Sequence, residues 1–291
     1  MNKLVIFGVG LIGGSVALAL KRSDPALHIV GVGRTGDNLQ AALDLGVIDQ
    51  IESSPAIALK KADMVIIAVP VAQTANILSA IAPHLEAQTI ITDVGSTKSD
   101  VLAHAQNLLG DKAARFVPGH PIAGAEKSGV TAAKVDLYDG KNVVLTPAEN
   151  TSELALQAVT KLWQATGANV SQMTAQQHDG IFAAVSHLPH LLAFALVDDL
   201  AGRANAKQLF DFAASGFRDF TRIAGSSPEM WRDISLANRT ALLTELAAYQ
   251  DELARMQSLL ENNDGVGLQA LFEQASQARN KWAHDREKLQ K

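Results

Sequence analysis

Two short loops carry the side chains best suited to proton-transfer chemistry. The first, 94–98, contains the hydroxyl of Ser96, and the second, 119–129, contains the imidazole of His120. The chain has no cysteine, so His120 is the best general base available, because its ordinary pKa already lies near working pH. A neighbouring serine hydroxyl could fix its tautomer. The alternative is a histidine that only caps a turn.

The segment 214–233 concentrates three arginines and a tryptophan. Arg218 and Arg222 are one helical turn apart, so on a helix they share a face and could grip an anionic ligand as bidentate carboxylate clamps. The alternative is surface ion pairing with Asp219 and Asp233.

Three histidines, His178, His187 and His190, lie on an apolar helical background that Pro189 interrupts. They invite a metal interpretation, but no glutamate or second carboxylate stands at ligand spacing in the manner of an HExxH helix. We therefore expect no metal, and we interpret these histidines as lining a pocket or as satisfied core residues.

A glycine-rich stretch near the amino terminus predicts a nucleotide site. Four apolar residues precede it, a helical run follows it, and a second strand is expected at 29–32. In such a strand–turn–helix unit the glycines allow a tight turn, close approach of the backbone to a pyrophosphate, and close helix–strand packing. The predicted dinucleotide contacts are Gly8, Gly10, Leu11, Ile12 and Gly13.

The end of the second strand bears on the choice of cofactor. NAD-binding proteins usually place a carboxylate there for the ribose hydroxyl, whereas an arginine accommodates the extra phosphate of NADP. Here the residues are Arg34 and Thr35, which favours NADP over NAD, the alternative being an arginine that only covers the adenine ring. Val69 and Pro70, at the end of a further strand, complete the predicted cofactor contacts.

Composition indicates a globular protein and excludes several classes. The 291 residues are 47% apolar and 19% charged, with a net charge of −5 and no basic run, which argues against nucleic-acid binding. Without cysteine there is no disulfide or thiolate chemistry. The residues before the first strand leave no room for a signal peptide, and we judge that no apolar run approaches membrane-spanning length. We expect a cytoplasmic protein that binds no membrane.

Alternation of strands and helices predicts the architecture that positions these residues. We expect a doubly wound parallel sheet of the α/β Rossmann class over residues 1–173, followed by an all-α domain over 174–291. Ligands of such sheets bind beyond the carboxyl ends of the strands, where the loops above would lie. The expected strands are 4–7, 29–32, 64–69, 89–93 and 115–118, with short edge strands at 142–145 and 169–173, and long amphipathic helices at 234–260 and 265–288.

Taken together, the motifs resemble the prephenate/arogenate dehydrogenase family of tyrosine biosynthesis. The match spans nearly the whole chain in the right order, and the segments around His120 and Arg222 are specific. The motifs are Gly8–Ser15, Asp93–Ser96, Gly119–Gly124 with Glu126, Ser186–His190, Phe217–Ala224 and Met230–Asp233.

This resemblance implies an oxidative decarboxylation of prephenate or arogenate with hydride transfer to NAD(P)⁺. By similarity, His120 takes the proton of the C4 hydroxyl, Ser96 orients that histidine and touches the cofactor, and Arg222 grips a substrate carboxylate. The other implied pocket residues are Arg218, Glu126, His178, His190 and Trp231. The family's helical domain forms a homodimer, and no metal is needed because rearomatisation drives the reaction.

Two other classes stay open on the sequence alone. A β-hydroxyacid dehydrogenase shares the layout but usually takes its acid/base lysine from the helical domain, where this chain offers no match. A non-catalytic NAD(P)-sensing protein would have no reason to combine His120 with Arg218 and Arg222. The sequence does not decide between prephenate and arogenate.

Overall fold

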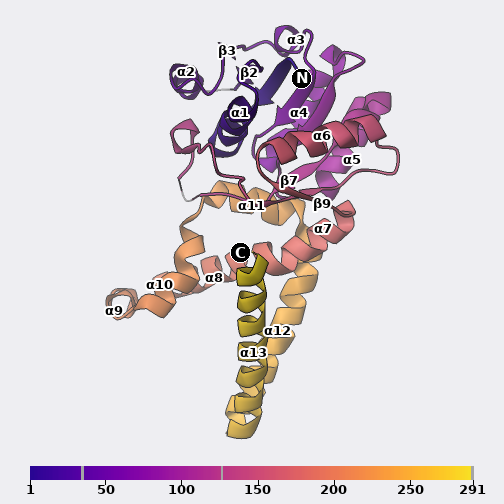
Figure 1. The fold of residues 1–291 in the computed structure, drawn as a ribbon. Coiled ribbons are helices and arrows are strands. Elements are labelled where there is room, and N and C mark those ends of the chain that lie inside the picture. The colour runs from indigo at the N-terminus through magenta and orange to yellow at the C-terminus, as the bar shows by residue number, and fades with distance from the viewer. Residues whose placement is uncertain (34–35, 126, 290–291) are drawn as a thin grey trace. The chain divides into compact units, whose positions relative to one another are not determined.

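The larger of two sheets organises the amino-terminal part of the structure, a computed structural model that describes residues 1–33, 36–125 and 127–289. Its six strands are all parallel and lie in the order β3-β2-β1-β4-β5-β6 (Figure 1). That order is the dinucleotide-binding order of doubly wound folds, so the predicted fold class is confirmed. The strands are β1 (Lys3–Phe7), β2 (His28–Val32), β3 (Gln50–Ile51), β4 (Met64–Ile67), β5 (Ile90–Asp93) and β6 (Phe116–Val117).

A second, three-stranded sheet continues from the last strand of the first. In it β8 (Asn142–Leu145) pairs antiparallel with β7 (Gly119–Pro121) and parallel with β9 (Asn169–Gln172). The helices of the sheet region are α1 (Leu11–Ser23), α2 (Gly36–Asp44), α3 (Pro55–Ala58), α4 (Thr74–Ile81), α5 (Ser99–Leu109) and α6 (Glu153–Ala165).

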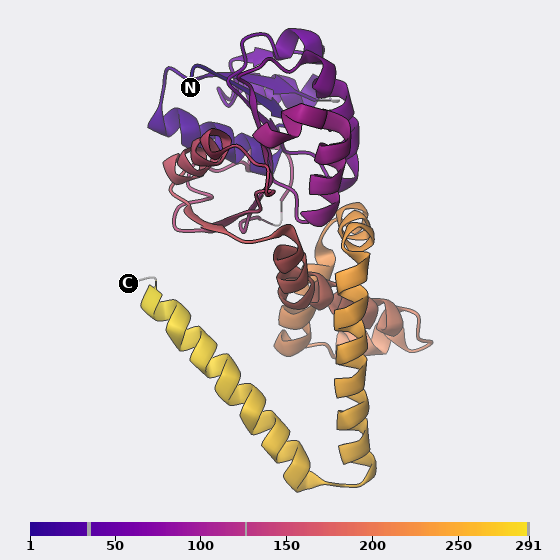
Figure 2. The same ribbon diagram turned by 90° about the vertical axis from the view of Figure 1, so that its right-hand side faces the viewer.

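Alternating side chains of β1 supply both faces of the large sheet. Leu4 and Ile6 belong to one buried cluster, with residues of α1 and α6, whereas Val5 and Phe7 belong to the other, with residues of α4 and α5. Figure 2 shows α1 (indigo) and α6 (rose) on one side of the sheet and the purple helices α4 and α5 on the other. Both faces are covered, and residues 4–7 of β1 and all of β4 are continuous apolar runs, as expected for parallel strands buried on both sides.

The helical region that follows begins with one continuous helical segment. It comprises α7 (Ala175–Phe182), a turn of π-helix (Ala183–His187) and α8 (Leu188–Ala201). Pro189 does not interrupt it, contrary to the sequence interpretation; it lies in the first turn of α8, directly after the π-helical turn. The remaining helices are α9 (Ala206–Asp211), α10 (Ser215–Thr221), α11 (Pro228–Ala237), α12 (Arg239–Glu261) and α13 (Gly265–Leu289).

The continuous helix Ala175–Ala201 also bears on the expectation that no apolar run approaches membrane-spanning length. By length and composition alone, this one helix within the described residues is long and apolar enough to cross a membrane. The expectation that no apolar run approaches that length was therefore wrong.

The chain forms two compact units that divide within α12. The first, Met1–Leu242, contains both sheets and α7 to α11, and α11 packs on the 3₁₀ turn Val71–Gln73. The second, Leu243–Lys291, contains most of α12 and all of α13, which diverge from the turn that joins them (Figure 2). All the predicted site residues that the structure describes lie in the first unit.

Candidate active site

The glycine turn after β1 has the geometry of a dinucleotide cradle. Gly8 has φ +95°, and a Cβ there would lie 2.3 Å from the carbonyl oxygen of Ala68, beside Val69. A Cβ on Gly13 would lie 2.3 Å from the carbonyl oxygen of Gly8, whereas one on Gly10 would meet nothing within 4 Å. The first and third glycines are thus needed for the turn and for close packing, and the second leaves its backbone open to a ligand.

The start of α1 completes this cradle. Leu11 and Ile12 form its first residues, and no side chain caps the helix at Gly10. The N–H groups of a first helical turn have no partners within the helix, and with the helix dipole they favour a phosphate. These residues fit a dinucleotide. The remaining predicted cofactor residues, Arg34 and Thr35, lie outside the described residues.

A buried ion pair fixes the two loops that carry Ser96 and His120. Lys98 Nζ lies 2.6 Å from Asp93 Oδ2, and both side chains are almost wholly buried. The Asp93 carboxylate also accepts hydrogen bonds from the backbone N–H of Gly95 (2.8 Å) and Gly119 (3.1 Å). The end of β5 is thereby tied to the start of β7, so the residue after Gly119 is held at the carboxyl edge of the sheet.

That residue, His120, contacts the helical region rather than Ser96. Its Nδ1 lies 2.8 Å from His178 Nε2, and its ring meets Phe182 edge-on, with ring centroids 4.8 Å apart. Burial is the main cause that holds the pKa of His120 well below its ordinary value, and His178, Lys98 and His187 add to it. At neutral pH the imidazole is therefore uncharged and able to accept a proton.

His178 lies behind His120 instead of facing an open pocket. Its side chain is fully buried, and its Nδ1 lies 2.8 Å from Asp179 Oδ1. The Asp179 carboxylate also accepts from the backbone N–H of Lys98 (2.9 Å) and Ser99 (2.8 Å), at the start of α5. One carboxylate thus supports a histidine and caps a helix distant in sequence.

A second buried histidine on the same helical segment has a different partner. Asn238 Nδ2 lies 3.0 Å from His187 Nδ1 and also donates to the carbonyl oxygen of Asp179 at 2.8 Å. Burial is the main cause that lowers the pKa of His187 to about 4. Asn238 therefore joins α7, the π-helical turn and the end of α11.

This lowered pKa predicts acid sensitivity of the fold. The unfolded chain takes up a proton near pH 6.5, where folded His187 does not, so the free energy of unfolding should fall as pH drops from about 6.5 to about 4 and be insensitive to this group above that window. Urea unfolding at a series of pH values measures the slope. His187→Asn, whose amide oxygen can still accept from Asn238, should be less pH-sensitive. An identical slope in both proteins would exclude this assignment.

Three of the predicted substrate residues gather at one place. The rings of His190 and Trp231 are stacked, with centroids 3.6 Å apart and an interplanar angle of 20°. His190 Nδ1 donates to the carbonyl oxygen of Ser186 (2.9 Å), while burial, opposed by that bond, and then the charge of Arg222 lower the pKa of His190. A flat surface and a guanidinium group therefore lie near each other.

Arg218 behaves differently from Arg222. Its side chain is 77% exposed, and its Nε lies 3.6 Å from Asp219 Oδ1. Helix α10 ends at Thr221, and Arg222 opens a 3₁₀ turn, so the two arginines do not belong to one α-helix as the spacing suggested. Arg218 therefore forms a surface ion pair with Asp219, which was the alternative to a role in gripping an anionic ligand.

Two further predicted site residues are Glu126 and Ser96. Glu126 lies outside the described residues. Within the described chain, Ser96 makes no hydrogen bond to His120, and the side chain bonded to a ring nitrogen of His120 is that of His178. Sequence reasoning missed Asp93, Lys98, Asp179 and Asn238 as supports, although a carboxylate directly after His178 was a usable signal.

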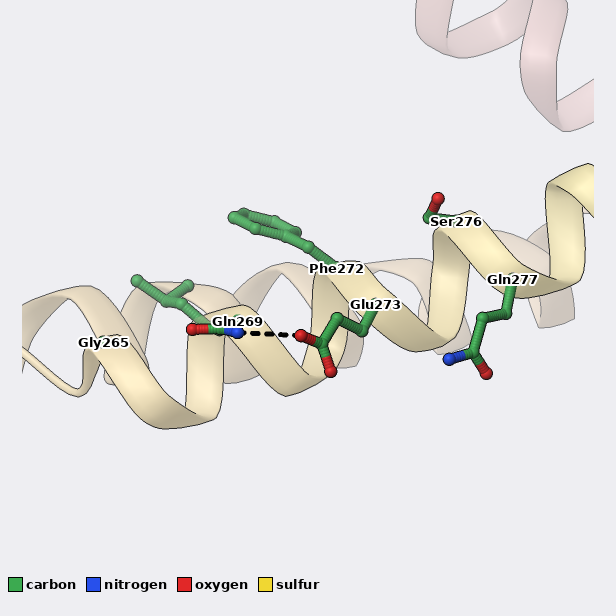
Figure 3. A pocket seen from close by; sticks show the side chains of 7 residues that line it. Gly265, Gln269, Phe272, Glu273, Ser276 and Gln277 are labelled. Atoms are coloured by element: carbon green, nitrogen blue, oxygen red, sulfur yellow. Dashed lines mark hydrogen bonds between the residues drawn. The ribbon is translucent and has the colours of Figure 1, made fainter.

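Among the residues that the structure describes, no group of three or more His, Cys, Asp or Glu side chains could hold a metal ion. Figure 3 shows an open groove along α13. The groove contains no predicted site residue, and its polar side chains include Gln269, which donates to Glu273 at 2.8 Å. It is lined by Gly265, Leu268, Gln269, Phe272, Glu273, Ser276 and Gln277.

The dinucleotide cradle and the uncharged imidazole at the same sheet edge define a nicotinamide-dependent dehydrogenase. Residues 16–172 match the family model for the prephenate dehydrogenase nucleotide-binding domain, and residues 174–274 match that for the prephenate dehydrogenase dimerization domain. The chain therefore belongs to the prephenate dehydrogenase family.

Individual relatives agree with this assignment. The chain is 40% identical over 281 residues to a prephenate dehydrogenase of Bacillus subtilis (strain 168), covering 96% of this chain and 76% of the relative. It is similar in structure to a prephenate dehydrogenase from A. aeolicus in complex with hydroxyphenyl propionate and NAD⁺, with TM-score 0.92, 37% identity, and 97% and 98% of the two chains covered. It is also similar to the arogenate dehydrogenase of Synechocystis, with TM-score 0.82, 30% identity, and coverage of 96% and 99%.

Proposed function

We propose that this protein oxidises prephenate or arogenate at the C4 hydroxyl, with loss of the ring carboxylate as CO₂. The observation that carries the proposal is His120, an uncharged imidazole held at the carboxyl edge of a dinucleotide-binding sheet. The bound nicotinamide supplies the hydride acceptor. Relatives named prephenate and arogenate dehydrogenase support this substrate class.

In the proposed reaction His120 takes the hydroxyl proton as the C4 hydride departs, so the C4 oxygen becomes a carbonyl. The electron pair of the bond to the leaving carboxylate then enters the ring, which becomes aromatic, and the C4 oxygen, now a phenolate, takes the proton back from His120. The product is 4-hydroxyphenylpyruvate from prephenate or tyrosine from arogenate. Because rearomatisation supplies the driving force, the protein needs only to position the ring, deprotonate the C4 hydroxyl and neutralise the substrate carboxylates.

Arg222, His190 and Trp231 are the proposed substrate contacts. The exposed guanidinium of Arg222 can meet a carboxylate bidentately, while the stacked rings of His190 and Trp231 offer a flat apolar wall. Arg218 was proposed from sequence for the same role, but its ion pair with Asp219 makes it the weaker candidate.

The direct test supplies prephenate and arogenate, each with NAD⁺ and with NADP⁺, while reduced cofactor and CO₂ are measured together. We expect reduced cofactor and CO₂ in equal amounts from at least one pairing of substrate and cofactor. Reduced cofactor without CO₂ would point instead to a simple hydroxyacid oxidation, and neither product from any pairing would refute the proposal.

We propose further that NADP⁺ is preferred to NAD⁺, because Arg34 and Thr35 follow β2, where a carboxylate would otherwise meet the ribose. Arg34→Asp should lower kcat/KM for NADP⁺ relative to NAD⁺ by about 10-fold or more, the size of a lost charge-assisted hydrogen bond. Arg203→Asp, which changes an exposed arginine paired with Asp199, should leave the ratio unchanged. A wild-type preference for NAD⁺ would contradict the proposal.

We propose that the working form is a homodimer built through the helical region. Large apolar side chains of the second unit are exposed, including Leu260, Val266, Phe272 and Trp282. Light scattering should give twice the mass of one chain. Phe272→Asp should shift the protein toward the monomer, whereas Leu154→Asp, at an exposed leucine of α6, should not. A monomeric wild type at working concentration would rule this out.

We also propose that the protein acts in the cytoplasm without entering a membrane. The apolar helix Ala175–Ala201 supports the absence of membrane insertion, because its polar side chains are bonded to other parts of the protein. Asp179 accepts from the N–H groups at the start of α5, His178 bonds to His120, and His187 bonds to Asn238. These polar groups are satisfied by protein partners, which lipid would not offer.

A further inference from the structure

Three side chains form a continuous hydrogen-bonded row behind the edge of the sheet. His120 Nδ1 lies 2.8 Å from His178 Nε2, and His178 Nδ1 lies 2.8 Å from Asp179 Oδ1. The first residue comes from β7, and the other two are adjacent on α7. His178 uses one ring nitrogen toward each neighbour, so the hydrogen positions are linked from one end of the row to the other.

The Asp179 end of the row can only accept. Two backbone N–H groups, from Lys98 and Ser99, already point at its two oxygens. Burial opposes ionisation, but the hydrogen bonds from His178, Ser99 and Lys98 outweigh it and lower the pKa of the Asp179 carboxyl group. An ionised carboxylate has no hydrogen to give, so His178 Nδ1 must donate to it.

The hydrogen on His178 decides the state of its other nitrogen. Burial is the main cause that lowers the pKa of His178, although the bond to Asp179 acts in the opposite direction. The ring is therefore neutral at working pH and carries a single hydrogen, which is on Nδ1. Its Nε2 has a lone pair, so the short contact to His120 requires a hydrogen on His120 Nδ1.

His120 is thereby left with its lone pair on Nε2. Among the described residues none forms a hydrogen bond with this nitrogen. We propose that His178 and Asp179 are positioning residues that hold His120 in the one tautomer able to accept a proton at Nε2, an inference that rests on the proposed role of His120 as the base. When His120 gains that proton, its Nδ1–H bond to His178 persists and the Asp179 carboxylate partly offsets the new charge, as a carboxylate does for histidine in hydrolase triads.

Other charged and titratable groups act on the row without replacing this effect. Lys98 and His187 both disfavour a positive charge on His120, and Asp93 acts on His178 in the opposite sense. None of them is bonded to either histidine ring in the part of the chain described. They shift the proton affinity of the row, whereas His178 and Asp179 determine on which nitrogen the hydrogen sits.

The first test observes the tautomer directly and needs no substrate. ¹⁵N NMR of histidine-labelled protein, with His120 assigned by comparison with His120→Ala, should show a hydrogen on Nδ1 and none on Nε2 at neutral pH. A hydrogen on Nε2 would overturn the inference. This result is independent of whether prephenate or arogenate is turned over, so it separates failure of the inference from failure of the proposed function.

The second test compares two replacements of His178. In His178→Gln the amide oxygen can still accept from His120 Nδ1, whereas His178→Leu fills the space without an acceptor. We expect His178→Leu to lower kcat by about 10²–10³-fold with little change in KM, and His178→Gln to retain most of the activity. The NMR spectrum of the leucine variant should show the Nε2–H tautomer of His120.

The matched control repeats both replacements in a His120→Ala background. If His178 acts only through His120, replacing it should lower kcat no further in a protein that already lacks the His120 imidazole. Equal losses in the two backgrounds, or equal losses for leucine and glutamine, would show a merely structural role and overturn the inference. If the leucine variant does not fold, the wild-type tautomer and the glutamine variant still decide the question.

Discussion

Replacing His120 by alanine should lower kcat by about 10²–10⁴-fold while leaving the affinity for the nicotinamide cofactor nearly intact. The imidazole is the uncharged base of the site, and its contacts run to His178 and Phe182 rather than to the glycine turn. Its loss should therefore affect the proton-transfer step and spare the dinucleotide cradle. Steady-state kinetics, with cofactor binding followed by fluorescence titration, measures both effects.

The pH profile provides the control for this first prediction. Because burial holds the pKa of His120 well below its ordinary value of 6.5, kcat/KM should stay level as pH falls through 6.5 and decline only at more acid pH. The residual activity of His120→Ala should lack that decline. Unchanged turnover in the variant would remove His120 from the mechanism.

Replacing Arg222 by alanine should raise the KM for substrate by about 10–100-fold, the expected effect of losing charge-assisted hydrogen bonds worth about 1.5–3 kcal/mol. The guanidinium lies near the stacked rings of His190 and Trp231, and its charge already affects the pKa of His190. Arg222 is exposed, so we expect a smaller loss of substrate binding than breaking a buried ion pair would cause.

Arg218→Ala is the matched control for Arg222. It removes the same group from the same segment, but its guanidinium is exposed and paired with Asp219. We expect a change in KM of no more than about threefold, since exposed ion pairs contribute little. Equal effects of the two replacements, or a loss in Arg222→Ala confined to cofactor binding, would contradict the proposed division of roles.

The sheet was predictable because its signals are local. The apolar run before Gly8, the spacing of the three glycines and the alternation of strands with helices each occupy a short stretch of sequence. The structure adds the reasons for the spacing, since a Cβ at Gly8 or Gly13 would collide with backbone oxygens.

The supports of the base were not predictable in the same way. Asp179 meets Lys98 and Ser99 across about 80 residues of chain, and no local pattern announces such a contact. The family resemblance placed His178 at a pocket position and gave the orienting role to Ser96. The contact of His178 with Nδ1 of His120 joins residues that are distant in sequence, so only the structure reveals it. Arg218 and Arg222 were expected on one helix, but α10 ends between them.

The π-helical turn Ala183–His187 has a consequence for how the chain can vary. His187 lies nine positions after His178, which in a regular α-helix, at about 100° per residue, would put the two side chains on opposite sides. The wide turn takes up an additional residue, and both side chains are buried. The number of residues in this turn therefore matters more than which residues they are. Substitutions at the exposed Val185 should be tolerated. Removing one residue from the turn would rotate α8 and carry His190 away from Trp231.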